Sequence, residues 1–291
     1  MNLHPINESI LNLYQSYRDG STSDLFDRKI PMFYGVMAPR KMLIIGANPS
    51  FPKAEEQHEK IIKWSAELNG QRPFKTKKDF DAFFGSRDNL DVVDKNTAVR
   101  VQELFVLKYK NYFHEKLDHL AYAWGQDRES ISFNTRPWNY IDVFQSRITK
   151  LDELKRRILK EGRSPKVAGT TFLKESVKMA CELVLSANPE VIVVLNAYSC
   201  KVLTEYASDL FPPMSRVDVR TGAVHSNGRN GQLRDVRIFY TSMVTGQRAI
   251  DLGSYLRLQW SIAHASGRLA QDPSWKPVLP SKDDGETAHD F

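Results

Sequence analysis

Short apolar runs alternate with segments of helical periodicity along this chain. Residues 42–45 and 191–195 are uninterrupted apolar runs, the pattern of strands that are buried on both faces of a sheet. Two further strands are predicted at residues 138–144 and 238–240, which are rich in β-branched and aromatic side chains. Helices are predicted at residues 6–17, 98–120, 151–161, 171–187, 197–207 and 250–265. This alternation predicts an α/β fold with a mainly parallel sheet.

The chain has 291 residues, enough for one large domain with appendages. We expect a single domain over residues 1–271 that carries an N-terminal helical extension and an insertion around residues 52–130. The segment 272–291 holds three prolines and clustered charges, which is typical of a flexible, disordered tail or a loosely docked arm.

The charge balance suits a polyanionic partner without requiring one. Lys and Arg number 41 against 35 Asp and Glu, which gives a net charge of +6 and a pI of about 9.1. No apolar run approaches the roughly 20 residues that span a bilayer, and residues 1–8 lack the pattern of a secretion signal. We therefore expect a cytoplasmic protein with no membrane partner.

The cysteines and histidines give no support for a metal site. Cys181 and Cys200 are the two cysteines of the chain, and their spacing fits neither zinc, an iron-sulfur cluster nor a disulfide framework. His114 and His119 are five positions apart, so they do not closely share one face of a helix. Two packed free thiols, no metal and no cofactor are expected.

The segment Gly46-Ala47-Asn48-Pro49-Ser50 directly follows the first predicted strand. A loop at this place lies at the carboxyl end of a parallel sheet, where α/β proteins generally bind ligands. Gly46 permits an unusual backbone and Pro49 stiffens it, so the Asn48 amide can be held against a sugar or a water molecule. The alternative is a purely structural loop with a turn-forming asparagine.

Four segments, in this order, resemble motifs of the uracil-DNA glycosylase superfamily. Residues 46–50 look like its first motif, in the Asn-bearing version of the mismatch-specific and single-strand-selective branches. Residues 140–143 are similar to the strand that reads the flipped base, and residues 188–197 to the third strand and its turn. Residues 241–246 fall where the second motif belongs. The resemblance implies a three-layer α/β/α fold with a central, mainly parallel four-stranded sheet.

The resemblance also implies the roles of the residues in the first motif. Asn48 would position the attacking water, or stabilise the sugar as the glycosidic bond breaks. Because an amide is a weak base, this version implies a slower enzyme or a good leaving base. The base pocket would further be lined by Gly46, Ala47, Pro49, Ser50, Phe84 and Asn196, with Phe84 preferred as the stacking platform among several phenylalanines.

Asp142 departs from the family's uracil-reading pattern, which has an Asn at the corresponding position. A carboxylate only accepts hydrogen bonds, so it suits the exocyclic amine of a cytosine-type base and repels the O4 of uracil. A protonated Asp142 could serve both bases. The alternative is a structural acid that caps a helix or pairs with an arginine such as Arg147.

The second motif lacks the histidine that uracil-removing relatives carry, since Ser242 and Met243 stand there. Met243 or Val244 could still act as a wedge in the base stack, with Gly246 forming the turn. Gln247 and Arg248 would then hold the opposite strand and the phosphates. The alternative is a plain strand-to-helix loop with a buried methionine.

These observations together favour a DNA glycosylase that flips its target base and leaves an abasic site. The expected substrate is a modified cytosine such as glucosylated hydroxymethylcytosine, as in phage-defence glycosylases. Uracil or mismatched thymine is the alternative substrate, with a role in DNA repair. A non-catalytic DNA-binding relative and a small-molecule hydrolase are alternatives of other classes. DNA is the expected partner, and we expect a monomer.

Overall fold

The computed structural model describes most of the chain outside several connecting segments and the C-terminal end. The described residues are 2–16, 31–47, 76–84, 94–100, 111–126, 136–146, 152–155, 169–228, 232–244 and 249–280.

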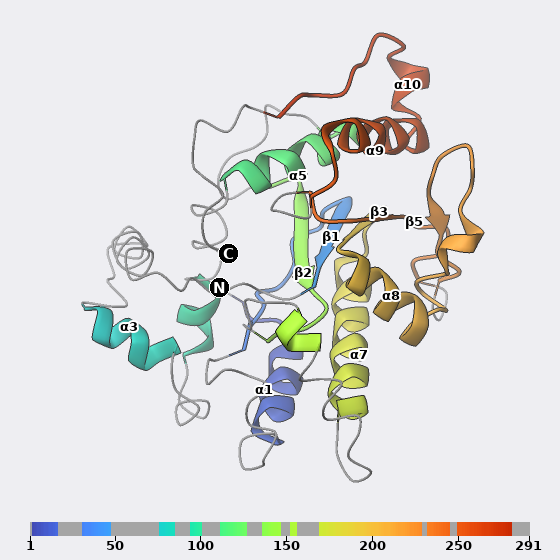
Figure 1. Ribbon diagram of the computed structural model, residues 1–291. Helices are drawn as coiled ribbons and strands as arrows, with labels where there is room; N and C mark the ends of the chain where they lie inside the picture. The colour runs from blue at the N-terminus through green and yellow to red at the C-terminus, as the bar shows by residue number, and fades with distance from the viewer. Residues whose placement is uncertain are drawn as a thin grey trace. The chain divides into compact units, whose positions relative to one another are not determined.

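A five-stranded, mostly parallel sheet organises the described residues (Figure 1). Its order is β2 (Trp138–Asp142), β1 (Met42–Gly46), β3 (Val191–Leu195), β5 (Arg237–Thr241) and β4 (Val224–His225). The first four strands are parallel to their neighbours, and β4 pairs antiparallel with β5. The predicted α/β class and mainly parallel sheet are confirmed. The predicted number of four strands is wrong for this sheet, because the two-residue β4 is too short to produce a pattern in the sequence.

The helices begin and end within a few residues of most predicted bounds. They include α1 (Ile6–Ser16), α3 (Lys77–Phe84), α5 (Asn111–Ala123), α7 (Gly169–Ala187), α8 (Ala197–Tyr206), α9 (Leu252–Ala265), α10 (Arg268–Gln271) and the short 3-10 helix η4 (Met214–Arg216). Asp251 accepts a hydrogen bond from the Ser254 amide and so caps α9. The backbone turns at Asn188, which has a φ of 43°, just after the end of α7.

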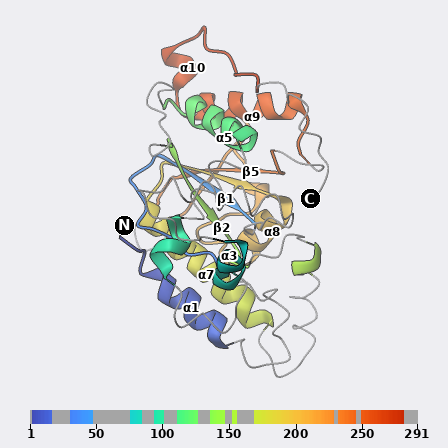
Figure 2. The same cartoon turned by 90° about the vertical axis from the view of Figure 1, so that its left-hand side faces the viewer.

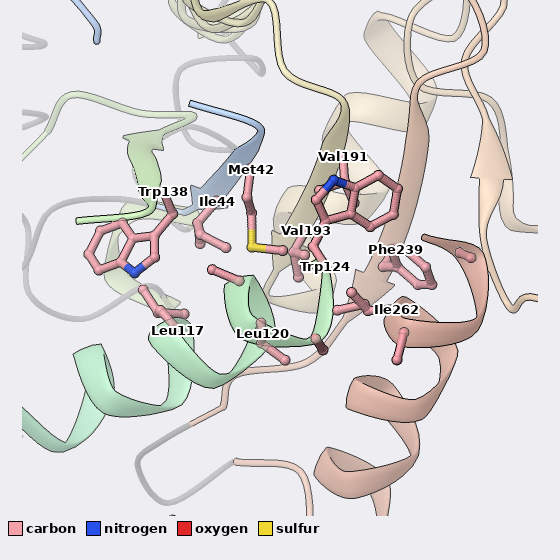
Figure 3. Packing of buried hydrophobic residues seen from close by; sticks show 14 of the residues in the cluster. Met42, Ile44, Leu117, Leu120, Trp124, Trp138, Val191, Val193, Phe239 and Ile262 are labelled. Carbon is pink, nitrogen blue, oxygen red and sulfur yellow. The ribbon is translucent and has the colours of Figure 1, made fainter. Parts of the chain in front are cut away.

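One face of the sheet packs against α5 and α9. Side chains alternate along a strand, so positions 42 and 44 of β1 face the same way as 191 and 193 of β3. Figure 3 shows these residues meeting Leu117, Leu120 and Ile262 of the two helices. The helices lie side by side in both views (Figures 1 and 2). β1 and β3 have no polar residue, because both of their faces are buried.

The chain divides into two compact units that interleave in sequence. The first comprises residues 1–37, 48–109 and 144–179, and contains α1, α3 and the first part of α7. The second comprises residues 38–47, 110–143 and 180–291, and contains the whole sheet with α5, α8, α9 and α10. Within the described part of the chain, no helix is long and apolar enough to cross a membrane.

Candidate functional site

The carboxyl ends of β1 and β3 form a topological switch point. From β1 the chain continues to β2 on one side, and then crosses to β3 on the other side of β1. In open parallel sheets, ligands bind outside the carboxyl ends of the strands at such a point. Gly46 ends β1 and Asn196 follows β3, so two predicted site residues lie at this place.

Gly46 lies directly beneath two polar side chains of β2. It pairs with Asp142 in the register of the parallel strands, and Tyr140 stands two residues earlier on the same face. The Tyr140 hydroxyl donates a hydrogen bond to Asp142 Oδ1 at 3.1 Å. A Cβ at position 46 would overlap both of these oxygens and would lie 2.9 Å from Tyr140 Cζ. Only glycine therefore leaves room for this pair of side chains.

Asp142 is buried at the strand end, with 1% of its surface exposed. A buried carboxylate needs hydrogen-bond donors, and the Tyr140 hydroxyl is one of them. Asp142 thus lies next to the backbone that leads into Asn48. Asn48 itself is outside the described residues, so the predicted convergence of the two side chains stays a prediction.

Two hydrogen bonds to the Gly46 carbonyl hold the backbone where the chain leaves β1. The Gly46 oxygen accepts from the Val143 amide at 3.1 Å and from Ser199 Oγ at 3.3 Å. Ser199 is fully buried in the first turn of α8. Because α8 and the end of β2 hold the same carbonyl, the backbone that leads to residue 48 leaves the sheet from a fixed point.

Asn196 caps a helix at the same edge. Its side-chain oxygen accepts from the Tyr198 amide at 2.9 Å, and its backbone has a φ of 83°. The left-handed backbone is one that asparagine tolerates better than most residues. Asn196 is predicted as a base-pocket residue. Its hydrogen bond gives it a structural role, and its place in the pocket stays a prediction.

Cys200 packs between β3 and β5 near this edge. Its thiol lies 3.7 Å from the backbone oxygens of Val194 and Thr241. Burial raises the pKa of the Cys200 thiol to about 11. A thiol in this state is a packing group and a poor nucleophile. Cys181 is buried as well, and neither cysteine forms a disulfide, so the prediction of two packed thiols is confirmed.

The loop after β5 exposes two of the predicted DNA-contacting residues. Ser242 is exposed and Met243 is partly exposed. Val244, in contrast, is fully buried and belongs to the apolar cluster beneath the sheet. The Val244 side chain contributes to the core, and its role as a possible wedge stays a prediction. Of the two candidates, Met243 has exposed surface.

Several predicted site residues cannot be placed. Asn48, Pro49, Ser50, Gly246, Gln247 and Arg248 lie outside the described residues. Ala47 is described and buried directly after the end of β1. Phe84 is the last residue of α3, which belongs to the first unit, and its role as a stacking platform stays a prediction.

Three residues with defined contacts at or near this edge were not predicted. They are Tyr140, Ser199 and Lys116, whose ammonium donates to the Val244 carbonyl at 2.7 Å. The two-residue repeat of a strand places Tyr140 on the same face as Asp142, so this signal was present in the sequence. Lys116 carries no such signal, because a lysine in an amphipathic helix normally faces solvent.

No protein-family model matches the chain, and no curated protein matches it significantly in sequence. Within the described residues, no group of three or more His, Cys, Asp or Glu side chains is placed to hold a metal ion.

Proposed function

We propose that this protein is a DNA N-glycosylase that removes a modified cytosine, such as glucosylated hydroxymethylcytosine, and leaves an abasic site. The observation that carries the proposal is the buried carboxylate of Asp142, which accepts a hydrogen bond from Tyr140 beside Gly46 at the switch point of the sheet. It joins the two segments, 46–50 and 140–143, that most resemble the uracil-DNA glycosylase superfamily.

The carboxylate of Asp142 favours an amino-bearing base. Tyr140 donates its hydroxyl proton to Asp142, and an ionised carboxylate can only accept hydrogen bonds. A carboxylate therefore suits the hydrogens of an exocyclic amine. Uracil and thymine would instead present the O4 acceptor, which a carboxylate repels. The pair therefore supports cytosine-type bases over uracil.

Access to Asp142 requires a movement of the atoms around it. With 1% of its surface exposed, the carboxylate contacts an incoming base only when the groups that cover it are displaced. Displacement of this kind is common when a substrate completes an active site. We therefore expect Asp142 to act on the bound base rather than to recruit DNA.

Hydrolysis needs one water and no cofactor. The water oxygen forms a bond to the anomeric carbon of the sugar, and the bond between that carbon and the base nitrogen breaks. The bonding electrons leave with the base, and the departing base takes up, through solvent, the proton that the water releases, so the products are a sugar hydroxyl and a neutral free base. Asn48 would orient the water or stabilise the cationic sugar, since its amide is too weak a base to take the proton.

A glycosylase assay with defined duplexes tests the proposal. Duplexes that carry cytosine, hydroxymethylcytosine, its glucosylated form, uracil or mismatched thymine are incubated with the protein and cleaved with alkali. We expect strand cleavage at a modified cytosine and a loss of about 100-fold or more in Asn48→Ala. Release of uracil or thymine alone would favour the repair activity. DNA binding without any base release would favour a non-catalytic binding protein.

Asp142→Asn tests the recognition of the base separately from the cleavage of the glycosidic bond. Asparagine presents an amide donor where the wild type presents an acceptor, so the preference should shift from amino-bearing bases toward uracil. A discrimination of about 1–3 kcal/mol corresponds to roughly 5- to 150-fold. Asp209→Asn, which removes the same charge at an exposed position, is the matched control. An unchanged preference in Asp142→Asn contradicts the assignment.

A further inference from the structure

A lysine is buried beneath the loop that follows β5. Lys116 lies in α5 with 8% of its surface exposed, and its ammonium donates to the Val244 carbonyl at 2.7 Å. The same ammonium lies 5.4 Å from the centre of the Tyr255 ring. Lysine is rarely buried to this extent, because removing an ammonium from water is costly. An apolar side chain would fill this space without the cost of burying a charge.

The ammonium is one of several groups that hold the start of this loop in place. The Ile250 amide donates to the Met243 carbonyl at 2.8 Å, and Met243 forms a parallel β-bridge with Ala249. The Val244 side chain is fully buried at the same point. The backbone at Met243 and Val244 is thus held from both sides, while Met243 keeps part of its side chain exposed.

Lys116 is itself held in place by α9. The Tyr255 hydroxyl donates to the Lys116 carbonyl at 3.0 Å and lies 3.2 Å from His119 Nδ1. Tyr255 is 1% exposed, and α9 begins two residues after Ile250. The loop, α5 and α9 therefore form one connected frame, in which the lysine links the helix to the loop backbone.

We infer that Lys116 is a positioning residue that holds Ser242 and Met243 in place as a contact surface for duplex DNA. The inference rests on the proposed function, since it takes DNA as the partner. An apolar side chain that is only partly covered can press between base pairs, and this is effective only if its backbone is rigid. Lys116 would act through the Val244 carbonyl, without touching the DNA.

The test compares Lys116→Met with Lys41→Met. Methionine keeps the packing of the lysine stem and removes the ammonium. Lys41 is exposed and makes a long ion pair of 3.8 Å with Glu190, so its replacement controls for the loss of one positive charge. In Lys116→Met, hydrogen exchange at the Ile250 amide should accelerate about tenfold or more, because a hydrogen bond from a charged donor to the loop is lost.

The same variant should bind its substrate duplex less well without slower chemistry. We expect the KM for the duplex to rise about tenfold and the kcat to stay within about twofold, the result of losing ground-state contacts. The thermal midpoint should shift by only a few degrees, because removal of a buried charge offsets the lost hydrogen bond. Met243→Ala should raise the KM as well, while the Ile250 amide exchanges as in the wild type.

The outcomes separate the two proposals. If Lys116→Met matches Lys41→Met in both exchange and KM, the positioning role is wrong while the glycosylase proposal stands. An unchanged KM in Met243→Ala likewise overturns the contact surface. A wild-type protein that neither binds nor cleaves any duplex overturns both proposals.

Discussion

Gly46→Ala tests the packing at the end of β1. The added methyl would overlap the Tyr140 hydroxyl and Asp142 Oδ1, and would lie 2.9 Å from Tyr140 Cζ. Carbon atoms in contact prefer about 3.5–4.0 Å, so both side chains must move. The φ of Gly46 is not in the left-handed region, and the expected cost is therefore one of space rather than of backbone strain.

The size of the effect follows from two contributions. Overpacking a well-filled site costs about 1–3 kcal/mol, and loss of the hydrogen bond from Tyr140 to a buried carboxylate costs about 1.5–3 kcal/mol. We expect Gly46→Ala to lower the free energy of unfolding by about 3–5 kcal/mol. With an unfolding entropy of about 2.1 cal/mol/K per residue, the thermal midpoint of this 291-residue chain should fall by roughly 5–8 °C. Urea unfolding followed by circular dichroism gives the free energy directly.

A double-mutant cycle with Tyr140→Phe identifies the cause. The phenylalanine removes the overlapping oxygen and the hydrogen bond in advance, so Gly46→Ala should cost about 2 kcal/mol less in that background. Gly253→Ala, inside α9 at a negative φ, should stay within about 1 kcal/mol of the wild type. Equal costs of Gly46→Ala in both backgrounds would refute the proposed contact.

Two further predictions concern a buried thiol and a partly buried carboxyl group. The pKa of Cys200 is about 11, so roughly one Cys200 thiol in a thousand is ionised at pH 8, and Cys181 is buried as well. Iodoacetamide should therefore label neither cysteine before the protein unfolds. Rapid labelling of the native protein would contradict this prediction. Burial raises the pKa of Asp118 above its usual 3.8, against the opposing effect of Trp138 and Arg136. The folded state then binds the proton more tightly than the unfolded state, so the free energy of unfolding should fall as pH rises from about 3.8 to the raised pKa. Asp118→Asn should remove this contribution to the pH dependence, as measured by urea unfolding at several pH values.

The strands were predictable where the sequence pattern is continuous. The apolar runs at residues 42–45 and 191–195 became β1 and β3, because strands covered on both faces need no polar residues. β4 left no such pattern, since two residues paired at a sheet edge need no particular side chains. Of the helix predicted at 98–120, residues 98–100 and 111–120 are helical, and residues 101–110 lie outside the described part of the chain.

The site was predictable only in part, because its contacts depend on strand register. The sequence shows that Gly46 and Asp142 each lie at the end of a strand, but their pairing across β1 and β2 requires the fold. Lys116 could not be found at all. Its burial depends on the path of the loop at Val244, which is 128 residues away in sequence.

The strand register also changes how strongly the first motif, residues 46–50, supports a catalytic function. Gly46 looks like a family residue in the sequence, yet the overlap with Tyr140 and Asp142 would require a glycine there whatever the protein does. The packing of this chain therefore accounts for Gly46, and the glycine carries little evidence for catalysis. Packing does not account for Asp142 in the same way. A buried carboxylate at a strand end is costly, and an apolar residue would pack there more stably. The functional argument consequently rests on the acid and on Asn48, and these are the two residues whose substitution should change the chemistry.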